Sequence, residues 1–200
     1  MAARPTYHHG ALREALLEAG EKILRERGVA GLSLRAIARE AGVSHGAPAH
    51  HFQDLAGLLS ELAAVGFRRF SACLRAARPT AKPKRFARAY ITFALENPAM
   101  FTLMFREGHP LDHDRPALAE ARREAFEVLR QAMTSAEEGQ RLRIEEVGAM
   151  AAGWSVEHGL AVLAIDGGLQ ALLALAPPGA SLDELLDSAL AQLEFTEAKA

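Results

Sequence analysis

The sequence predicts an all-α protein of 200 residues. Apolar residues recur three and four positions apart along most of the chain, which is the spacing of one face of a helix. No stretch of the sequence alternates between apolar and polar residues as a half-buried strand does. Half of the residues are hydrophobic, so the chain can bury a substantial core, which excludes disorder as its main state.

Leu34–Phe52 has the most specific local pattern, and it follows a first amphipathic helix predicted over 10–27. Gly42 lies where a tight turn between two short helices needs a positive φ, and Ala38 supplies the small residue needed at their crossing. Ser44 is expected to accept a hydrogen bond from the N–H groups that open the second short helix. These features are typical of a helix-turn-helix unit, which reads DNA with the exposed face of that helix.

The rest of the chain predicts further helices and a domain boundary. Asp54 is expected to cap a connecting helix over about 55–76, and a two-proline segment over 78–83 then breaks the pattern. We therefore expect a DNA-binding domain over 1–55 and a second helical domain over 80–200. Within the second domain, helical spacing predicts helices over 84–97, 98–106, 118–132 and 144–166, and a last helix that starts with a capping box of Ser181 and Glu184.

Charge and cysteine content agree with a DNA-facing end on a protein of the cytoplasm. Residues 1–52 hold seven Lys and Arg against five Asp and Glu, whereas the rest of the chain holds sixteen against twenty. Cys73 is the single cysteine, which excludes an intrachain disulfide and fits a reducing compartment. The first residues lack the apolar run of a secretory signal. The long apolar stretch 147–165 contains Glu157 and His158, so we expect a buried helix and no membrane segment.

With these elements in this order, the chain resembles the TetR family of transcriptional regulators. The residues that carry the N-terminal resemblance are Tyr7–Gly10, Leu34–Val43, Ser44–Ala47 and His50–Phe52. Further along, Trp154–Gly159 resembles the Trp-His-Gly signature of one class of C-terminal domains of this family, and Glu96–Phe101 is similar to a Pro-Phe segment there. The resemblance implies a homodimer that binds a palindromic operator and usually represses a nearby gene until a small molecule binds the C-terminal domain.

Three positions depart from the family pattern. Where Pro48, Ala49 and Leu55 stand, family members commonly have an aliphatic residue, a tyrosine and a lysine. Loss of the tyrosine and the lysine is expected to remove two contacts to DNA phosphates. Pro48 is expected to delete a hydrogen bond of the first helical turn and to tilt the helix.

The candidate DNA-binding residues divide into those that position the protein and those that read the sequence. Base-edge readout is assigned to His45, Ala47 and His50, and the adjacent Gly46 also faces outward. Arg4 is expected to reach the minor groove from an N-terminal arm. Phosphates are expected to be held by Ser33, Arg35, Ser44, His51 and the N–H groups at the helix starts near Leu34 and Leu55.

The second domain predicts an apolar site with a polar pair on one stripe of the long helix, Trp154 and His158. A core tryptophan beside a satisfied histidine explains this pair equally well. Soft and aromatic residues elsewhere in the domain favour a cavity for a small, largely apolar effector. The candidate effector-binding residues are Phe93, Met100, Phe101, Met104, Phe105, Phe126, Trp154 and His158.

Two other functions and one assembly were weighed. An enzyme that pairs His158 with Glu157 or Asp166 is disfavoured, because adjacent helix positions point about 100° apart and no serine, cysteine or phosphate-binding loop accompanies them. A metal site in the loop with His109, Asp112, His113 and Asp114 is disfavoured against a solvated loop, so no metal or cofactor is expected. Dimerisation is expected through small residues of the long helix, Ala152, Ser155 and Gly159, and apolar residues of the last helix, Leu182, Leu185, Leu186, Ala189 and Leu193.

Overall fold

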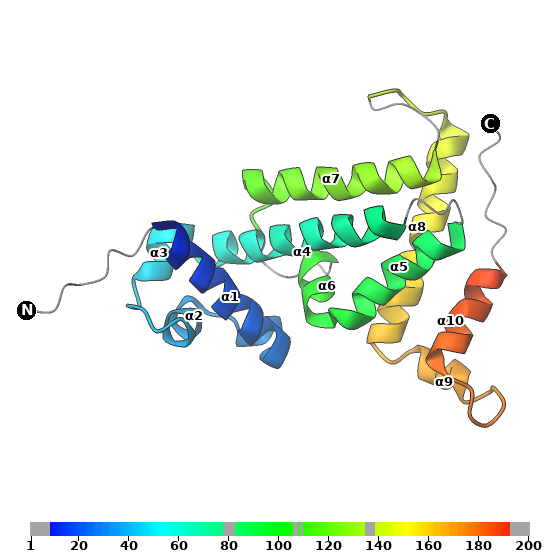
Figure 1. Ribbon diagram of the computed structural model, residues 1–200, viewed down its shortest axis with the longest axis horizontal. Helices are drawn as coiled ribbons and strands as arrows, with labels where there is room; N and C mark the ends of the chain where they lie inside the picture. Colours follow the sequence, from blue (N-terminus) through cyan, green and yellow to red (C-terminus); the bar gives the residue numbers. More distant parts are fainter. Residues whose placement is uncertain (1–8, 78–82, 106–107, 109, 135–138, 193–200) are drawn as a thin grey trace, which may run out of the picture. The chain divides into compact units, whose positions relative to one another are not determined.

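The computed structural model describes residues 9–77, 83–105, 108, 110–134 and 139–192. Within these ranges all regular secondary structure is helical, and the all-α prediction is confirmed (Figure 1). The fold divides into two compact units. The first comprises the chain up to Phe67 together with Ala99–Arg122, and the second comprises Arg68–Pro98 together with the chain from Arg123 onward.

The first unit begins with the three helices predicted from the N-terminal pattern. They are α1 (His9–Arg27), α2 (Leu34–Glu40) and α3 (Ala47–Phe52), with a 3₁₀ turn at Val29–Gly31 between the first two. The three helices pack on one another around a common apolar core (Figure 1). Burial of each large apolar side chain contributes about 1.5–3 kcal/mol to stability. The largest of these buried side chains are Leu16, Ile23, Leu24, Ile37 and Phe52.

The turn between α2 and α3 has the geometry that the sequence predicts. Gly42 has φ 67°, and Ala38 at the crossing is fully buried. The Val43 N–H donates to the Ala38 carbonyl at 3.0 Å, which closes the end of α2. At the start of α2, the Ser33 hydroxyl accepts a hydrogen bond from the Ala36 N–H at 3.1 Å. Both ends of α2 are therefore fixed by local hydrogen bonds.

Two further helices complete the first unit. The N-terminal part of α4 (Leu55–Ala77) packs against α1, because a Cβ on Gly20 would meet the Leu62 side chain. Next, α6 (Pro98–Phe105) packs closely against α4, since Gly66 leaves room for the sulfur atoms of Met100 and Met104. The unit ends with the loop at 110–115 and the start of α7 (Pro116–Met133).

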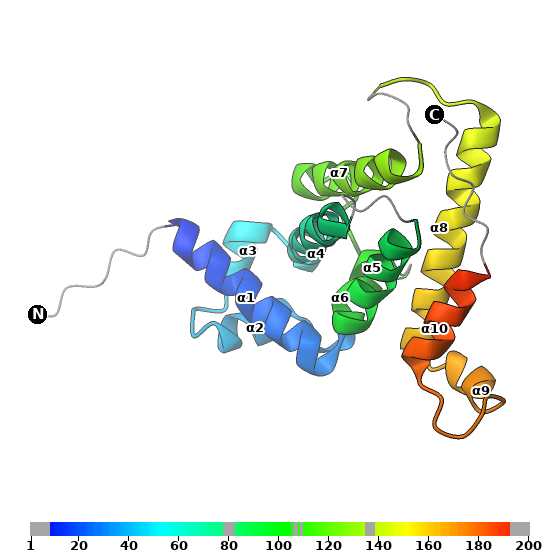
Figure 2. The same cartoon turned by 45° about the vertical axis from the view of Figure 1, so that its right-hand side comes forward.

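The second unit consists of α5 (Pro83–Glu96), α8 (Ile144–Ile165), α9 (Leu169–Leu173) and α10 (Leu182–Ala191), with the remaining parts of α4 and α7. Figure 2 shows α5 packed beside α8 and α10. Arg88 of α5 forms ion pairs with Asp183 and Asp187 of α10. The predicted capping box at the start of α10 is confirmed, because Ser181 and Glu184 exchange their side-chain hydrogen bonds.

The helix α8 is much more exposed than the sequence predicts. Met150, Glu157 and Ala161 are buried in the described chain, whereas the large apolar residues Ile144, Val147 and Leu163 are exposed. Among the described residues, α8 is the one helix with the length and apolar composition to cross a membrane, and these two criteria alone are weak grounds for a span. An apolar run in the sequence indicates that a helix is buried against other residues. It does not indicate whether those residues belong to the same chain or to a partner chain.

Candidate functional sites

The candidate DNA-binding residues lie on the exposed surface of α2, α3 and the turn between them. Pro48 and Phe52 point inward and hold α3 against the core, while its other side chains are exposed or half-buried. The exposed or half-buried members of the predicted set are Ser33, Arg35, Ser44, His45, Gly46, Ala47, His50 and His51. Arg4, the predicted minor-groove residue, lies outside the described residues. The described members are thus accessible, as direct contact with DNA requires.

The predicted role of Ser44 as a side-chain cap is wrong. The helix α3 begins at Ala47 with Gly46 as its N-cap, and no side chain caps it. Ser44 instead uses its backbone carbonyl, which accepts a hydrogen bond from the Ala47 N–H at 3.0 Å. Its side chain is exposed in the turn before α3. A hydroxyl in this place suits a contact to phosphate better than a capping role.

The predicted cost of Pro48 is also wrong. Pro48 occupies the first turn of α3, where a backbone N–H has no partner within the helix in any case. The first regular hydrogen bond of α3 runs from the His50 N–H to the Gly46 carbonyl at 3.2 Å, which Pro48 leaves intact. The proline ring is buried, where family members commonly have an aliphatic side chain. Pro48 therefore fits the helix and contributes to its core.

The junction between α3 and α4 is tightly constrained. Gln53 has φ 72° and ψ −61°, a strained conformation for a residue with a side chain. The carboxylate of Asp54 accepts a hydrogen bond from the Gly57 N–H at 2.8 Å, which confirms the predicted cap of α4. Gly57 must be glycine, because a Cβ there would collide with the Phe52 carbonyl oxygen. These constraints fix the orientation of α3 relative to the start of α4.

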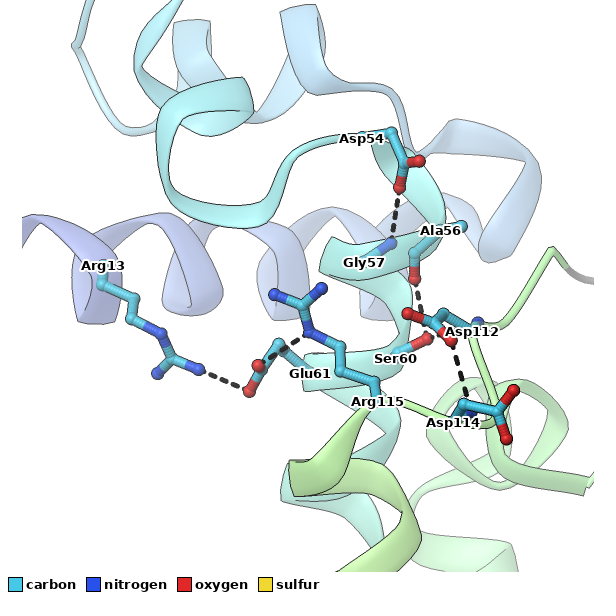
Figure 3. A network of polar contacts seen from close by, with 9 residues as sticks. All are labelled: Arg13, Asp54, Ala56, Gly57, Ser60, Glu61, Asp112, Asp114 and Arg115. Atoms are coloured by element: carbon cyan, nitrogen blue, oxygen red, sulfur yellow. Dashed lines mark hydrogen bonds and ion pairs between the residues drawn. The ribbon is translucent and has the colours of Figure 1, made fainter.

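A network of polar contacts around Glu61 ties the helix-turn-helix to the rest of the first unit (Figure 3). Glu61 of α4 is buried, and it forms ion pairs with Arg13 of α1 and with Arg115, whose Nε lies 2.9 Å from its carboxylate. Burial alone would raise the pKa of Glu61, but the hydrogen bonds from Arg115 and Arg13 hold it below its usual value. The Arg13 guanidinium also lies 5.5 Å from the centre of the Phe52 ring, at the end of α3.

The same network anchors the loop before α7 to α4. The Ser60 hydroxyl donates to the Ala56 carbonyl and accepts a hydrogen bond from the Asp112 N–H, both at 2.8 Å (Figure 3). The loop is closed internally by the Asp114 N–H, which donates to the Asp112 carboxylate at 3.2 Å. A chain of contacts therefore leads from this loop through Glu61 and Arg13 to the end of α3. Sequence analysis missed this network because its members are separated by about fifty positions.

The predicted effector-binding residues fall into two clusters, one in each unit. In the first unit, Phe105 packs edge-on against Phe67, with ring centres 5.2 Å apart, and also against Phe101. With Met100 and Met104 these residues form the methionine cluster, which is buried apart from the half-buried Phe105. The second unit contains Phe93, Trp154 and His158, and also Phe126, which is 54% exposed on α7.

Tyr90 of α5 is the centre of the second cluster, here called the Tyr90 cluster, which comprises Phe70, Tyr90, Phe93, Trp154 and His158. The Tyr90 hydroxyl accepts a hydrogen bond from the Trp154 indole N–H at 3.2 Å and lies 2.9 Å from His158 Nδ1. Its ring packs edge-on against Phe70 at 4.9 Å. Burial raises the pKa of Tyr90 and lowers the pKa of His158, so both groups are neutral at pH 7. Sequence analysis found Trp154 and His158 but not the tyrosine that joins them.

Glu157, beside His158 on α8, is a second residue that the candidate list missed. Glu157 is almost fully buried, with only 2% of the residue exposed to solvent. The Oε2 atom has no hydrogen-bond partner among the described residues. Burial raises the pKa of Glu157 to about 8. The sequence spacing could have indicated that Glu157 is buried. Glu157 lies seven residues after Met150 and four before Ala161, which places its carboxyl on the buried face of α8.

The fold and the exposed helix-turn-helix define a DNA-binding protein with a separate helical unit. Residues 16–62 match the family described as bacterial regulatory proteins, tetR family, and residues 84–189 match the description tetracyclin repressor-like, C-terminal domain. The chain belongs to the TetR family of transcriptional regulators. It is therefore a DNA-binding regulator, with a C-terminal domain of the kind that binds ligands in this family.

Solved structures support this assignment along nearly the whole chain. A protein of unknown function from Rhodococcus sp. RHA1 is 34% identical with a TM-score of 0.72, covering 94% of this chain and 96% of that one. A transcriptional regulator from Rhodococcus sp. RHA1 is 25% identical with a TM-score of 0.59, covering 90% and 94%. The multidrug binding protein EbrR, complexed with imidazole, shares the fold at 21% identity and a TM-score of 0.57, covering 96% of each chain. No curated protein matches the chain.

Proposed function

We propose that the protein is a ligand-responsive repressor, which binds a palindromic operator as a homodimer and releases it when an effector binds the C-terminal domain. The observation that carries the proposal is the exposed set of residues on α2, α3 and their turn, held on a rigid core. A repressor works in the cytoplasm, which is where we place the protein. We assign effector binding and not catalysis to the Tyr90 cluster, because no serine, cysteine or lysine belongs to it.

Operator recognition combines phosphate contacts with base readout. The side chains of Ser33, Arg35, Ser44 and His51 hold phosphates, and the exposed His45 and His50 with the methyl group of Ala47 contact base edges in the major groove. Gly46 lets the backbone approach the DNA, and Arg4 reaches the minor groove. In a dimer, two copies of α3 enter successive major grooves about 34 Å apart, and this requires a palindromic operator.

The exposed face of α8 is the proposed dimer contact. Ala152, Ser155 and Gly159 follow one another at spacings of three and four, and the space around a Cβ on Gly159 is open. The Ser155 hydroxyl donates to the Ala151 carbonyl at 2.7 Å, so burial against a second helix leaves it satisfied. With α10 of each copy, two α8 helices form a four-helix seam. We assign the C-terminal domain to the Trp-His-Gly class, because Tyr90 joins Trp154 and His158.

The effector is a small, largely apolar molecule that binds at the Tyr90 cluster. The likeness to the multidrug binding protein EbrR favours binding of a small ring compound. Occupancy favours an arrangement of the two α3 helices that does not match successive major grooves, and α4, which belongs to both units, carries the change. Moving the operator-bound state from mostly bound to mostly free requires several kcal/mol of preference between the two arrangements, on the order of 5 kcal/mol.

Selection from random DNA tests the proposal. The purified protein is incubated with a library of random duplexes at moderate salt, and the retained duplexes are sequenced. We expect an enriched palindrome, and loss of its sequence preference in a variant with both His45→Ala and His50→Ala, because each base contact contributes about 1–3 kcal/mol. His113→Ala, an exposed histidine away from the helix-turn-helix sequence, is the matched control and keeps the palindrome.

Absence of enrichment from a folded dimer would contradict operator binding. It would support the second candidate, a small helical enzyme or ligand-binding protein that lost strong DNA recognition through Ala49 and Leu55, where a tyrosine and a lysine are common. If the variant with both histidines replaced kept its full sequence preference, His45 and His50 would not read bases. The assignment as a repressor would still stand.

Light scattering tests the dimer. Gly159→Leu places a bulky side chain on the proposed seam, where the single chain leaves open space, and we expect it to weaken the dimer without unfolding the protein. Ala30→Leu places the same side chain on an exposed residue of the first unit and serves as control. A Gly159→Leu protein with an unchanged dimer constant would place the seam elsewhere.

A further inference from the structure

The least expected group in the second unit is the carboxyl of Glu157. A buried polar atom normally finds a hydrogen-bond partner, and an unsatisfied one costs about 1–3 kcal/mol. Glu157 is 2% exposed, and its Oε2 atom has no partner among the described residues. A leucine of similar size would remove this cost, so the core of the second unit gains nothing from the carboxyl. A functional use explains its presence better than a structural one.

The surroundings of Glu157 indicate what it can bind. Trp154 lies one turn before it on α8, and Tyr90 of the neighbouring α5 is close enough for its pKa to respond to the Glu157 charge. The Tyr90 hydroxyl is hydrogen-bonded to Trp154 and lies 2.9 Å from His158 Nδ1, whereas the Glu157 Oε2 atom has no hydrogen-bond partner among the described residues. Aromatic faces attract cations, and a carboxylate pairs with planar N–H donors in a bidentate fashion. The site therefore combines aromatic rings with an acidic group that has one unpartnered oxygen among the described residues.

We infer that Glu157 is the polar anchor of the effector site and that the effector is a small organic cation with an aromatic or otherwise apolar body. This inference rests on the proposed function, because it names the chemical class of the effector. The cation brings N–H donors to the unpartnered Oε2 atom, and its body packs against Trp154 and Tyr90. On binding, the Glu157 carboxyl loses its proton to solvent and the resulting carboxylate pairs with the cation.

The charged and titratable groups of α5 and α8, which pack against each other, leave room for such a cation. On α5, Arg88 is engaged by Asp183 and Asp187 of α10, and Tyr90 is neutral. On α8 itself, burial keeps His158 neutral at pH 7. Within the described residues no cation forms an ion pair with Glu157, so an incoming cation meets no internal competitor. Cation binding therefore requires only that the carboxyl of Glu157 release its proton.

Calorimetric titration with benzamidine tests the inference, and benzamide is its neutral counterpart of the same shape. Because binding needs the ionised carboxyl, the dissociation constant should fall roughly eightfold from pH 6.5 to 7.5 and roughly threefold from pH 7.5 to 8.5, if the pKa is about 8. Benzamide should show no such dependence and bind more weakly. Titrations in buffers of different ionisation enthalpy should show release of about one proton below pH 7.

Two variants make the result specific to this residue. Glu157→Gln keeps the size of the side chain but removes the charge, and we expect it to lose the pH dependence and at least tenfold in benzamidine affinity. Glu145→Gln, on an exposed glutamate in the first turn of α8, is the matched control and should behave as the unmodified protein. Thermal unfolding of both variants establishes that they are folded.

The outcomes separate this inference from the proposed function. Equal benzamidine affinity in Glu157→Gln and in the unmodified protein would overturn the role of Glu157, as would equal affinity for benzamide. Failure of benzamidine to bind would overturn the cation assignment, while an enriched palindrome in the DNA selection would leave the repressor standing. Failure of the DNA selection, with pH-dependent benzamidine binding intact, would overturn the repressor and support the cation site.

Discussion

Two buried glutamates, Glu61 in the first unit and Glu157 in the second, have opposite surroundings. Glu61 is paired with Arg13 and Arg115, which hold its pKa below the usual value. Glu157 has an oxygen without a partner, and burial raises its pKa to about 8. The first carboxylate is charged and joins three segments of the chain. The second is mostly protonated at pH 7, and its Oε2 atom has no hydrogen-bond partner among the described residues, so we assign a structural role to Glu61 and a ligand-binding role to Glu157.

The difference reflects what each unit must do. A DNA reader needs a fixed recognition helix, and the Glu61 network meets that need through Arg13, which also covers the Phe52 ring at the end of α3. An effector site needs polar groups that only the effector satisfies, because a site already satisfied by its own chain has little to gain from a ligand. Such a site reduces stability in the absence of its ligand.

The largest effect is expected from breaking the paired glutamate. Glu61→Ala should lower the free energy of unfolding by about 2–3 kcal/mol, because it leaves the mostly buried Arg115 without its partner. Urea unfolding measures the change, and Glu14→Ala, on an exposed glutamate of α1, is the control. A loss below about 0.5 kcal/mol would mean that the network adds nothing to the fold.

A change of opposite sign is expected at the unpaired glutamate. Glu157→Leu should raise the free energy of unfolding by about 1–2 kcal/mol, since it removes a buried carboxyl that lacks a partner. The same substitution should abolish benzamidine binding. Glu145→Leu on the exposed first turn of α8 should change stability by no more than about 0.5 kcal/mol. A destabilised Glu157→Leu protein would show that the carboxyl has a structural partner.

The pH dependence of stability should also differ in sign. The pKa of Glu61 is lowered in the folded state, so its contribution is present above about pH 4.5 and lost as the pH falls through the folded value. The pKa of Glu157 is raised, so the folded state becomes less stable as the pH rises from about 4.5 to about 8. Thermal unfolding from pH 3 to 9 measures how stability depends on pH. Glu61→Gln should reduce this dependence at acid pH, and Glu157→Gln should reduce it between about pH 4.5 and 8. Parallel profiles of the two variants would contradict the comparison.

The smallest effect is expected at the exposed end of the Glu61 network. Arg13 is 42% exposed, and its loss leaves Arg115 on the carboxylate, so Arg13→Ala should cost about 1 kcal/mol of stability. Operator affinity should fall more than stability, since Arg13 also contacts the Phe52 ring at the end of α3. Arg25→Ala on exposed α1 surface is the control. Equal operator affinity of the Arg13→Ala and Arg25→Ala proteins would show that the Glu61 network does not contribute to DNA binding.

Local signals in the sequence were sufficient for most of the fold. The caps at Asp54 and Ser181 and the turn at Gly42 each depend on residues within four positions, so they could be predicted from sequence alone. The role of Ser44 was predicted wrongly because the helix starts two residues later than expected, and a capping residue is defined only relative to that start.

Long-range pairing was beyond the same reasoning. Nothing near Glu61 in the sequence indicates that Arg13 and Arg115 meet on it, and Tyr90 is 64 positions from the Trp154 that donates to it. For α8, composition predicts an apolar helix but does not predict that Leu163 is exposed in the single chain. Apolar residues can be buried by a partner helix or by the core of their own chain, and the sequence does not distinguish the two. The division of the predicted effector residues between two units likewise needed the fold.

NMR titration of the glutamate side-chain carboxyl carbons measures the contrast between the two residues most directly. The account predicts one carboxyl that titrates near pH 8, whose signal is missing in Glu157→Gln and whose pKa falls when benzamidine binds. It predicts a second that titrates below the usual range and is missing in Glu61→Gln. If Glu157 instead titrates near pH 4.5 like an exposed glutamate, the carboxyl is solvated or paired, and its assignment as the anchor of an effector site is wrong.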